Sequence, residues 1–438
     1  MRAKVVHDDI NAGGGSERLA IVTMDLLTKM GFKVDLASFN EPNMEELKKD
    51  FGDIVDSIDV RPIPLDLFSM LGMTDSAVSQ DMTGTKDRQS TTNTDKTTTT
   101  TKAANTYDND SEYDLIINTH GDLLPYYNQT ADHSAEKSKK SIITYCHFPL
   151  VPQLLQEDNN NSQGYMRFLR KWINVDDIEE EFKEKILDNV SKTYDLMIKN
   201  TTVVTNSNFS KRAIEQHYGS TVKPVVIYPP VDTDKFHKIA LRSEDRENVI
   251  LVVSRFSPDK QLENIIEIGK ILINEIKIDA EIILVGNIST EDRQYLEELK
   301  QLIRKYNLDD KVTARVGISF DQLLELMRKS KVYLHPLAGE PFGISIVEAM
   351  SAGLIPVVPD EGGYTEFVPE YYQYHTHQQA ADVIGKILIA SDNNMQTERT
   401  QLSEGVSKFS TNTYKADLRK VIETLLSSKS SGHTQLAA

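Results

Sequence analysis

Two glutamates separated by seven residues, Glu340 and Glu348, carry the clearest chemical pattern in the sequence. The first falls in a proline-containing loop, and the second falls in a helix that is predicted to begin near Phe342. At the start of that helix the N–H groups of Phe342, Gly343 and Ile344 lack intrahelical partners, and such groups bind phosphate readily. Ionised carboxylates accept hydrogen bonds from sugar hydroxyls. The segment therefore predicts an anion and a sugar bound side by side.

Two cations, Arg255 and Lys260, follow a predicted strand at residues 249–255. An arginine can contact a diphosphate through two parallel hydrogen bonds, and a lysine can neutralise it as a point charge. The alternative is a solvated pair at a helix start, where the helix dipole disfavours cations. Because the pair is misplaced for the dipole, the pattern favours a bound anion.

These residues resemble those of a known family. The run G-E-P-F-G-I-x-x-x-E-A-M-x-x-G-x-x-P-V around Glu340 and Glu348 is similar to the E-x7-E signature of retaining GT-B glycosyltransferases, the group 1 or family 4 class. Arg255 and Lys260 match the R-x4-K diphosphate pair of that family. Outside this context the two glutamates would be a surface carboxylate and a helix carboxylate.

The resemblance implies a nucleoside-diphosphate sugar as donor. It implies that Glu340 contacts the transferred sugar, that Glu348 contacts the ribose, and that the cations and the helix-start amides hold the diphosphate. It also implies transfer with retention at the anomeric carbon, by same-face attack as the diphosphate leaves. Two further strand-and-loop units end in Gly286 and Ile318. We assign both to donor binding, since in the resembled family the loop at Ile318 packs on the nucleobase.

A glycine-rich loop, residues 11–18, lies near the N-terminus between a short predicted strand and an amphipathic helix. It is not a dinucleotide fingerprint, because Arg18 stands where the third glycine is needed, and no Gly-Lys-Ser/Thr follows as in a Walker loop. Its alternative is a flexible turn. In the resembled family a glycine loop here lies against the donor diphosphate and the acceptor. That assigns Gly14 and Gly15, where a missing side chain lets the backbone approach a ligand.

Two histidines follow predicted strands of the same N-terminal sheet. His147 lies in a segment, Tyr145 to Pro149, that resembles the Tyr-x-His-x-Pro of eukaryotic enzymes that add α-1,2-mannose to dolichol-linked oligosaccharide. This likeness places His147 beside the donor sugar and the reacting centre, with a structural cap as the alternative. His120 is a second candidate at the carboxyl edge of the sheet. The likeness predicts GDP-mannose as donor, with UDP-sugars next, and a glycan or polyprenyl-linked acceptor.

Alternating strands and helices predict an α/β protein with two Rossmann-like domains that face a cleft. We place the acceptor-side domain at residues 1–232 and the nucleotide-sugar-binding domain at residues 247–410. By resemblance, a helix at residues 411–427 crosses back to the first domain. Residues 428–438 are expected to form a disordered tail. Residues 74–110, rich in Thr, Ser, Asp and Lys, are predicted to be a disordered surface insertion.

Composition limits the partners and the compartment. The chain has 438 residues and a net charge of −17 with no basic stripe, so we expect no nucleic-acid binding. The single cysteine, Cys146, excludes an intramolecular disulfide and a cysteine-cluster metal site. No other metal motif is found, so we expect no cofactor and no obligatory metal. No apolar run approaches the ~20 residues that span a bilayer, and the N-terminal residues lack the apolar core of a signal peptide. We expect a cytoplasmic protein.

Association with the cytoplasmic face of a membrane is left open by residues 165–173, from Tyr165 to Ile173. They mix bulky apolar with basic side chains and include the only tryptophan, Trp172. Such a helix can rest on an anionic membrane surface, and a lipid-linked acceptor would be reached there. The alternative is a core helix with solvated basic residues.

Two rival functions fit the same fold: a nucleotide-sugar epimerase and a non-catalytic nucleotide-sugar-binding protein. The presence of both diphosphate cations, of Glu340 and of His147 argues against loss of activity.

Overall fold

The computed structural model describes the parts of the chain that form the two sheets and their helices. The described residues are 1–38, 40–57, 60–64, 113–120, 141–149, 188, 191–192, 194–240 and 246–432. The predicted insertion at residues 74–110 and the segment at residues 165–173 lie outside this set. Both expectations therefore stay predictions.

The first sheet contains seven described strands, all parallel, in the order β3-β2-β1-β4-β5-β6-β7. Its strands are β1 Arg2–Val6, β2 Lys33–Ser38, β3 Val60–Pro64, β4 Leu115–Asn118, β5 Ser141–Cys146, β6 Thr202–Thr205 and β7 Val225–Val226. All four residues of β4 are buried, as in a parallel sheet that is covered on both faces.

The second sheet contains six described strands, also parallel, in the order β10-β9-β8-β11-β12-β13. Its strands are β8 Glu247–Val253, β9 Glu281–Gly286, β10 Val312–Val316, β11 Ser330–Leu334, β12 Ile355–Pro359 and β13 Gln373–Tyr374. Every residue of β11 and β12 is buried. These two strands frame the loop that carries Glu340.

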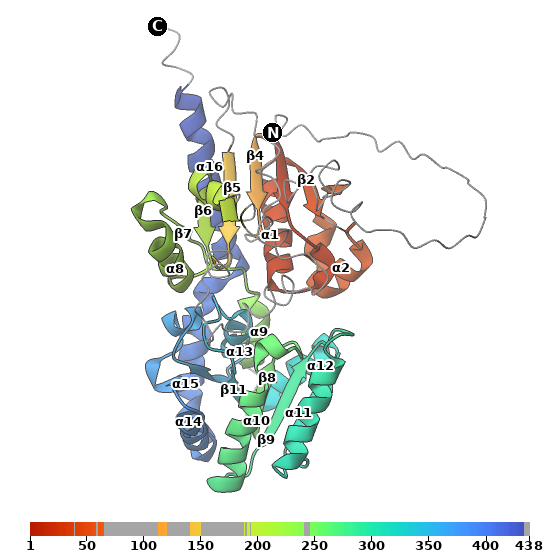
Figure 1. The fold of residues 1–438 in the computed structure, drawn as a ribbon, viewed down its shortest axis with the longest axis vertical. Coiled ribbons are helices and arrows are strands. Elements are labelled where there is room, and N and C mark those ends of the chain that lie inside the picture. The colour runs from red at the N-terminus through yellow and green to blue at the C-terminus, as the bar shows by residue number, and fades with distance from the viewer. Residues whose placement is uncertain are drawn as a thin grey trace, which may run out of the picture.

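Helices cover both sheets (Figure 1). In the first domain they are α1 Gly15–Lys29, α2 Met44–Phe51 and α8 Asn208–Tyr218, and residues 194–200 are also helical. In the second domain they are α9 Thr233–Ala240, α10 Glu263–Gly269, the π-helical turn Lys270–Glu275, α11 Arg293–Lys305, α12 Phe320–Lys329, α13 Ile344–Ser351, α14 His377–Ile389, α15 Asp392–Gly405 and α16 Thr411–Gly432. Among the described helices, none is long and apolar enough to cross a bilayer.

The C-terminal helix α16 crosses from the second domain to the first, which confirms the predicted crossover (Figure 1). Tyr414, Leu418 and Ile422 are buried in the core of the first domain. The Tyr414 hydroxyl lies 2.7 Å from the hydroxyl of Thr23 on α1. The helix extends beyond its predicted end at residue 427 to Gly432, so the expected disorder of residues 428–432 is wrong. No proline or glycine interrupts it before Gly432, and an established helix extends at little cost.

The chain leaves the first sheet near the domain boundary. Its last strand, β7, is only two residues long, and Pro229 and Pro230, which lack the N–H that a ladder needs, follow it. The polar stretch that follows contains α9, whose Phe236 is buried in the core of the second domain.

Both sheets have the strand order of a Rossmann fold, which confirms the predicted class. In each sheet the order reverses beside the first strand, between β1 and β4 and between β8 and β11. Ligands of such sheets bind at these reversal points, beyond the carboxyl ends of the strands. The segments that follow these four strands contain Gly14, His120, Lys260 and Glu340, so the predicted site residues cluster at the two reversal points.

Candidate functional site

Glu340 is held by backbone contacts between the loops that follow β11 and β12. The N–H of Gly363 donates to the carbonyl of Glu340 at 2.8 Å, and the N–H of Gly339 donates to the carbonyl of Glu361 at 2.6 Å. A Cβ atom on Gly363 would lie 1.9 Å from the carbonyl oxygen of Pro341. Only glycine at 363 permits this approach, which fixes the backbone of Glu340.

The carboxylate of Glu340 lies close to a histidine and a lysine. Oε2 lies 3.0 Å from His335 Nε2 and 3.7 Å from Lys260 Nζ. Burial alone would raise the pKa of Glu340, but the charges of Lys260, His335 and Arg255 outweigh it and hold that pKa well below its usual range. Glu340 is therefore a carboxylate at neutral pH, as the sequence predicts for a sugar-hydroxyl acceptor.

Lys260 and Arg255 follow β8, yet they are exposed to different degrees. Lys260 ends the 3-10 turn Pro258–Lys260, and its side chain is only 16% exposed. The Arg255 side chain is 69% exposed and lies 3.7 Å from Asp259. Both charges act on Glu340. The structure thus brings the predicted diphosphate pair to the predicted sugar carboxylate, with Lys260 in contact and Arg255 at the rim.

Glu348 lies within α13. Burial raises its pKa above the usual value, Asp232 adds to this, and the charges of Arg18 and Lys235 oppose it. The two glutamates of the pair therefore differ: Glu340 is held ionised by cations, and Glu348 lacks an ion-pair partner within 4 Å among the described residues.

The start of α13 presents free amides. Gly343 is the residue before the helix and has φ +94°, where a Cβ would lie 2.6 Å from Ile346 Cδ1. Phe342 is buried, with ring contacts to Tyr228 and Phe409. The N–H groups of Phe342, Gly343 and Ile344 have no hydrogen-bond acceptor among the described residues. They are available to an anion, as predicted.

Gly286 and Ile318 lie at the carboxyl ends of β9 and β10. A Cβ on Gly286 would lie 1.8 Å from the carbonyl oxygen of Ser254, so the chain after β8 packs directly on this glycine. The N–H of Gly317 donates to the Gly286 carbonyl at 3.0 Å, which places Ile318 next to that junction. The nucleobase contact assigned to Ile318 stays a prediction.

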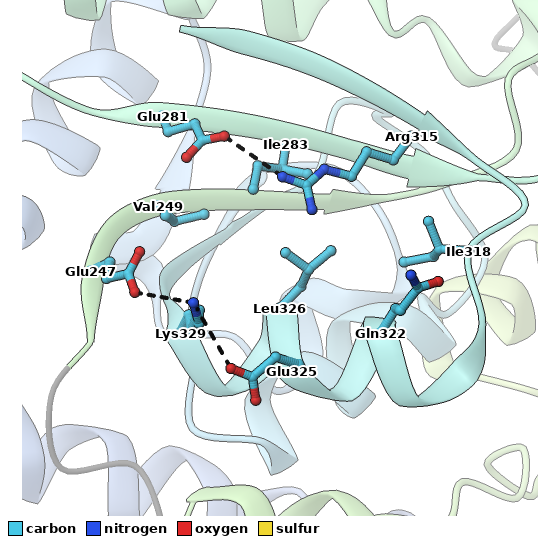
Figure 2. A pocket seen from close by; sticks show the side chains of 10 residues that line it. All are labelled: Glu247, Val249, Glu281, Ile283, Arg315, Ile318, Gln322, Glu325, Leu326 and Lys329. Atoms are coloured by element: carbon cyan, nitrogen blue, oxygen red, sulfur yellow. Dashed lines mark ion pairs between the residues drawn. The ribbon is translucent and has the colours of Figure 1, made fainter.

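Ile318 also lines a pocket of ≈ 300 Å³ between the sheet and α12 (Figure 2). Its other lining residues are Glu247, Val249, Glu281, Ile283, Arg315, Gln322, Glu325, Leu326 and Lys329. Ion pairs line it, between Arg315 and Glu281 on the sheet and from Lys329 to both Glu247 and Glu325. Apart from Ile318, none of the residues predicted to bind the nucleotide sugar lines this pocket, so we do not assign the nucleotide-sugar site to it.

In the first domain the glycine loop is shorter than predicted, because α1 already begins at Gly15. Gly14 precedes the helix, and its N–H donates to Glu17 Oε2 at 2.7 Å. This is the capping arrangement in which a glutamate in the first turn reaches back to the helix start. The last four residues of the predicted loop, 15–18, are therefore helical.

Gly15 marks the place where the two domains meet. A Cβ on Gly15 would lie 2.4 Å from Cδ1 of Ile344 at the start of α13. Three residues later on α1, Arg18 acts electrostatically on Glu348. The predicted glycine loop and the predicted donor helix are thus brought together, one from each domain.

His147 follows β5 and is neutral at physiological pH. Its Nε2 lies 2.9 Å from the carbonyl oxygen of Thr119, which can only accept, so Nε2 carries the proton and Nδ1 is left as the acceptor. Burial, aided by the charges of His120 and His7, lowers the pKa of His147 to about 4. Among the described residues, His147 makes no hydrogen bond or ion pair with the second domain.

His120 lies in a cluster with His7 and Asp8. Its Nδ1 is 2.8 Å from Asp8 Oδ1, and its ring meets that of His7 edge to face. Burial would raise the pKa of Asp8, but His120 and His7 lower it to about 2. In the described part of the chain, His7, Asp8 and His120 are the one group of three His, Cys, Asp or Glu residues whose ligand atoms lie close enough to hold a metal ion. The ion pair accounts for the cluster without one, and the expectation of no obligatory metal stays a prediction.

Sequence reasoning missed two residues of the first-domain half, His7 and Glu17. His7 is fully buried, with Nδ1 3.1 Å from the Thr119 hydroxyl and Nε2 3.5 Å from Glu17 Oε1. Glu17 could have been found, because a glutamate three residues after Gly14 is the spacing of a capping box. His7 could not, since a histidine at a strand end has many structural uses.

Comparison with known proteins gives a family match for part of the chain and a fold for nearly all of it. Residues 233–409 match the family described as Glycosyl transferases group 1. Over 214 residues, 46% of this chain and 42% of the relative, the chain is 29% identical to a GDP-Man:Man(3)GlcNAc(2)-PP-Dol alpha-1,2-mannosyltransferase of Dictyostelium discoideum. The protein of the same name from Neurospora crassa is 31% identical over 196 residues, 40% of this chain and 35% of the relative. The chain thus matches less than half the length of either relative.

Solved structures match over nearly the whole chain. Anabaena Alr3699/HepE in complex with UDP and glucose superimposes with a TM-score of 0.64 and 18% identity, covering 97% of this chain and 99% of that one. Sucrose-phosphate synthase from Thermosynechococcus elongatus gives a TM-score of 0.63 at 15% identity, covering 98% of this chain and 100% of that one. At these identities the likeness establishes the two-domain GT-B fold alone.

Proposed function

Because residues 233–409 match the family of group 1 glycosyl transferases, we propose that this protein is a retaining glycosyltransferase that uses a nucleoside-diphosphate sugar. The observation that carries the proposal is the placement of Glu340, whose carboxylate lies 3.7 Å from Lys260 and which stands in the loop that leads into the free amides at the start of α13. One loop and the helix after it thus supply a carboxylate for sugar hydroxyls and donors for a diphosphate.

On the donor side, Lys260, Arg255 and the amides of Phe342 to Ile344 would hold the diphosphate. Their main effect is to stabilise the charge that develops on the leaving group, which preorganised donors do well in a partly buried site. Glu340 would orient the transferred sugar, and Glu348 would accept from the ribose. Since two side chains supply the positive charge, we propose that no metal ion is obligatory. Rates should then be unchanged by a chelator.

On the acceptor side, Gly14 and Gly15 would lie against the donor diphosphate, and His147 would contact the sugar near the reacting carbon. The anomeric carbon loses its bond to the diphosphate oxygen and gains one to the acceptor oxygen on the same face. The acceptor proton passes to the departing diphosphate oxygen. His147 enters this step neutral, with Nδ1 as a hydrogen-bond acceptor.

We propose GDP-mannose as the donor and a polyprenyl-linked glycan as the acceptor, which the names of the sequence relatives support. A lipid-linked acceptor implies work at the cytoplasmic face of a membrane. Calorimetric titration of GDP and UDP tests the base, and we expect GDP to bind more tightly. Clearly tighter UDP binding would contradict the assignment.

Incubation with a panel of labelled nucleotide sugars and a lipid-linked mannosyl glycan tests the activity. We expect label on the glycan from GDP-mannose with the α anomer retained, and strongly reduced turnover by Glu340→Gln. A protein that binds the nucleotide but transfers no sugar from any donor would be a non-catalytic binder. Release of an isomerised nucleotide sugar without transfer would indicate an epimerase.

A further inference from the structure

Glu366 joins the two domains beside the candidate site. It ends the 3-10 turn Gly363–Glu366 in the second domain. Its Oε1 accepts from the backbone N–H of Phe209 at 2.8 Å, and its Oε2 accepts from Asn208 Nδ2 at 2.9 Å and from the Tyr228 hydroxyl at 3.0 Å. Asn208 and Phe209 form the first turn of α8 in the first domain.

The contact suits a carboxylate for two reasons. The N-terminus of a helix carries partial positive charge and has free N–H donors, and a negative side chain is favoured there. Hydrogen bonds to an ionised acceptor are also stronger than neutral ones. Burial and the charge of Glu366 raise the pKa of Tyr228 to about 12, so its phenol remains protonated and can donate.

The same contact lies between the residues assigned to catalysis in the two domains. On one side, Glu366 ends the turn whose first residue, Gly363, donates to the carbonyl of Glu340. On the other side, Ser210 in the first turn of α8 donates to the carbonyl of His147 at 2.9 Å. The ring of Phe209 stacks on that of Phe148 at 5.7 Å.

We propose that Glu366 is a positioning residue, which sets the relative placement of Glu340 and His147 by fastening the start of α8 to the turn beside Glu340. It touches neither substrate and acts through the backbone at both ends. The inference rests on the proposed function for the roles of Glu340 and His147, whereas the fastening itself depends only on the contacts of Glu366.

The chain offers a matched control. Glu398 accepts a hydrogen bond from Tyr371 at 2.7 Å, and both residues lie in the second domain. Glu366→Gln and Tyr228→Phe remove charge or one hydrogen bond across the domains, and Glu398→Gln and Tyr371→Phe remove the same groups within one domain. A glutamine cannot serve Glu366's three donors, because only one of its two terminal atoms accepts.

Sugar transfer, GDP affinity and X-ray scattering in solution should be measured on all four variants. We expect Glu366→Gln to lower kcat/KM about tenfold to hundredfold and Tyr228→Phe about threefold to tenfold, as the loss of charge-assisted hydrogen bonds implies. GDP affinity should stay within about twofold of the wild type, since the cations and amides that hold the diphosphate lie in the second domain. The two control variants should behave as the wild type.

Scattering separates this inference from the proposed function. If no donor supports transfer by the wild type, the function is wrong, but a larger radius of gyration for Glu366→Gln than for Glu398→Gln still supports the fastening. If Glu366→Gln fails to fold, Tyr228→Phe gives the test by the same measurements. Wild-type transfer and scattering in Glu366→Gln, or in a folded Tyr228→Phe should Glu366→Gln not fold, overturn the inference.

Discussion

The two reversal points of the molecule are built from different chemistry. At the second sheet, Lys260, Arg255 and Glu340 place charges within a few ångströms of one another. Beside the reversal point of the first sheet, His147 is kept neutral by burial and Gly14 contributes only backbone, while Asp8 is paired with His120. Both points occupy the same place in the same fold, so the difference arises from side chains rather than from topology.

The difference matches what each point has to hold. A diphosphate is negatively charged. A site whose cations are already in place needs no rearrangement when the diphosphate binds. A glycan acceptor is uncharged, and for it a neutral, partly buried hydrogen-bonding group costs less to desolvate than an ion would. The predictions below test this contrast, beginning with the largest expected effect.

Gly286→Ala and Gly14→Ala compare the backbones of the two points. At Gly286 the new methyl group would lie 1.8 Å from a backbone oxygen, so the chain must shift, and we expect a loss of about 3 kcal/mol or more in unfolding free energy. At Gly14 it would meet the carboxylate of Glu17, a side chain rather than backbone, at 2.6 Å, and we expect about 1 kcal/mol. Urea unfolding measures both. Equal losses would mean that the glycines play the same part.

Glu340→Gln tests whether charge matters at the second point. The substitution keeps the shape of the side chain and removes its charge from beside Lys260, and we expect kcat to fall ~10²–10³-fold with the fold retained. Initial rates at saturating donor and the far-ultraviolet circular dichroism measure this. Glu370→Gln, an exposed carboxylate of the same domain, serves as control. A rate near that of the wild type would remove Glu340 from the site.

The sequence was sufficient where the relevant contacts are local. The run from His335 to Glu348 contains its own strand end, proline breaks and glycine, so the loop, the helix and the position of Glu340 could be predicted together. The start of α13 falls two residues after Phe342, because Gly343 adopts φ +94° and delays the helix. Arg255 and Lys260 could be recognised as anion-binding candidates because they stand between the end of a strand and the start of a helix, where cations are otherwise disfavoured.

The sequence was insufficient where contacts are long-range. Glu366 and Asn208 are 158 residues apart, and no local pattern distinguishes Glu366 from an exposed acid. Arg246 is buried and donates to the carbonyls of Met327 and Ala352, at the ends of two different helices, although it lies between the two predicted domains. The histidine cluster is likewise assembled from two strand ends, those of β1 and β4, that only the sheet brings together.

Lys260→Ala and Arg255→Ala sharpen the contrast within the charged point. Lys260 is mostly buried and faces Glu340, whereas Arg255 is largely exposed. We expect kcat/KM to fall by about tenfold to hundredfold for Lys260→Ala, the effect of losing one charge-assisted contact, and by less for Arg255→Ala because water screens it. Steady-state kinetics at several salt concentrations measure both. A larger effect of Arg255→Ala would place the diphosphate nearer the rim.

His147→Gln tests the neutral point through pH. The pKa of His147 is lowered from 6.5 to about 4 in the folded protein, chiefly by burial. Between pH 4 and pH 6.5 this histidine binds a proton in the unfolded chain but not in the folded protein. The contribution of neutral His147 to the free energy of unfolding is therefore fully present above pH 6.5 and declines as pH falls toward 4.

The expected loss over that pH range is about 1–2 kcal/mol, less than the ~3 kcal/mol of the full shift, because the side chain is partly exposed. Urea unfolding of the wild type and His147→Gln at pH 7 and pH 4.5 measures it, and the variant should lose less stability on acidification. A wild-type rate profile that titrates near pH 6.5 because of His147 would contradict a neutral histidine. His147 would then carry a charge near neutral pH, as Lys260 and Glu340 do, and the contrast between the two points would fail.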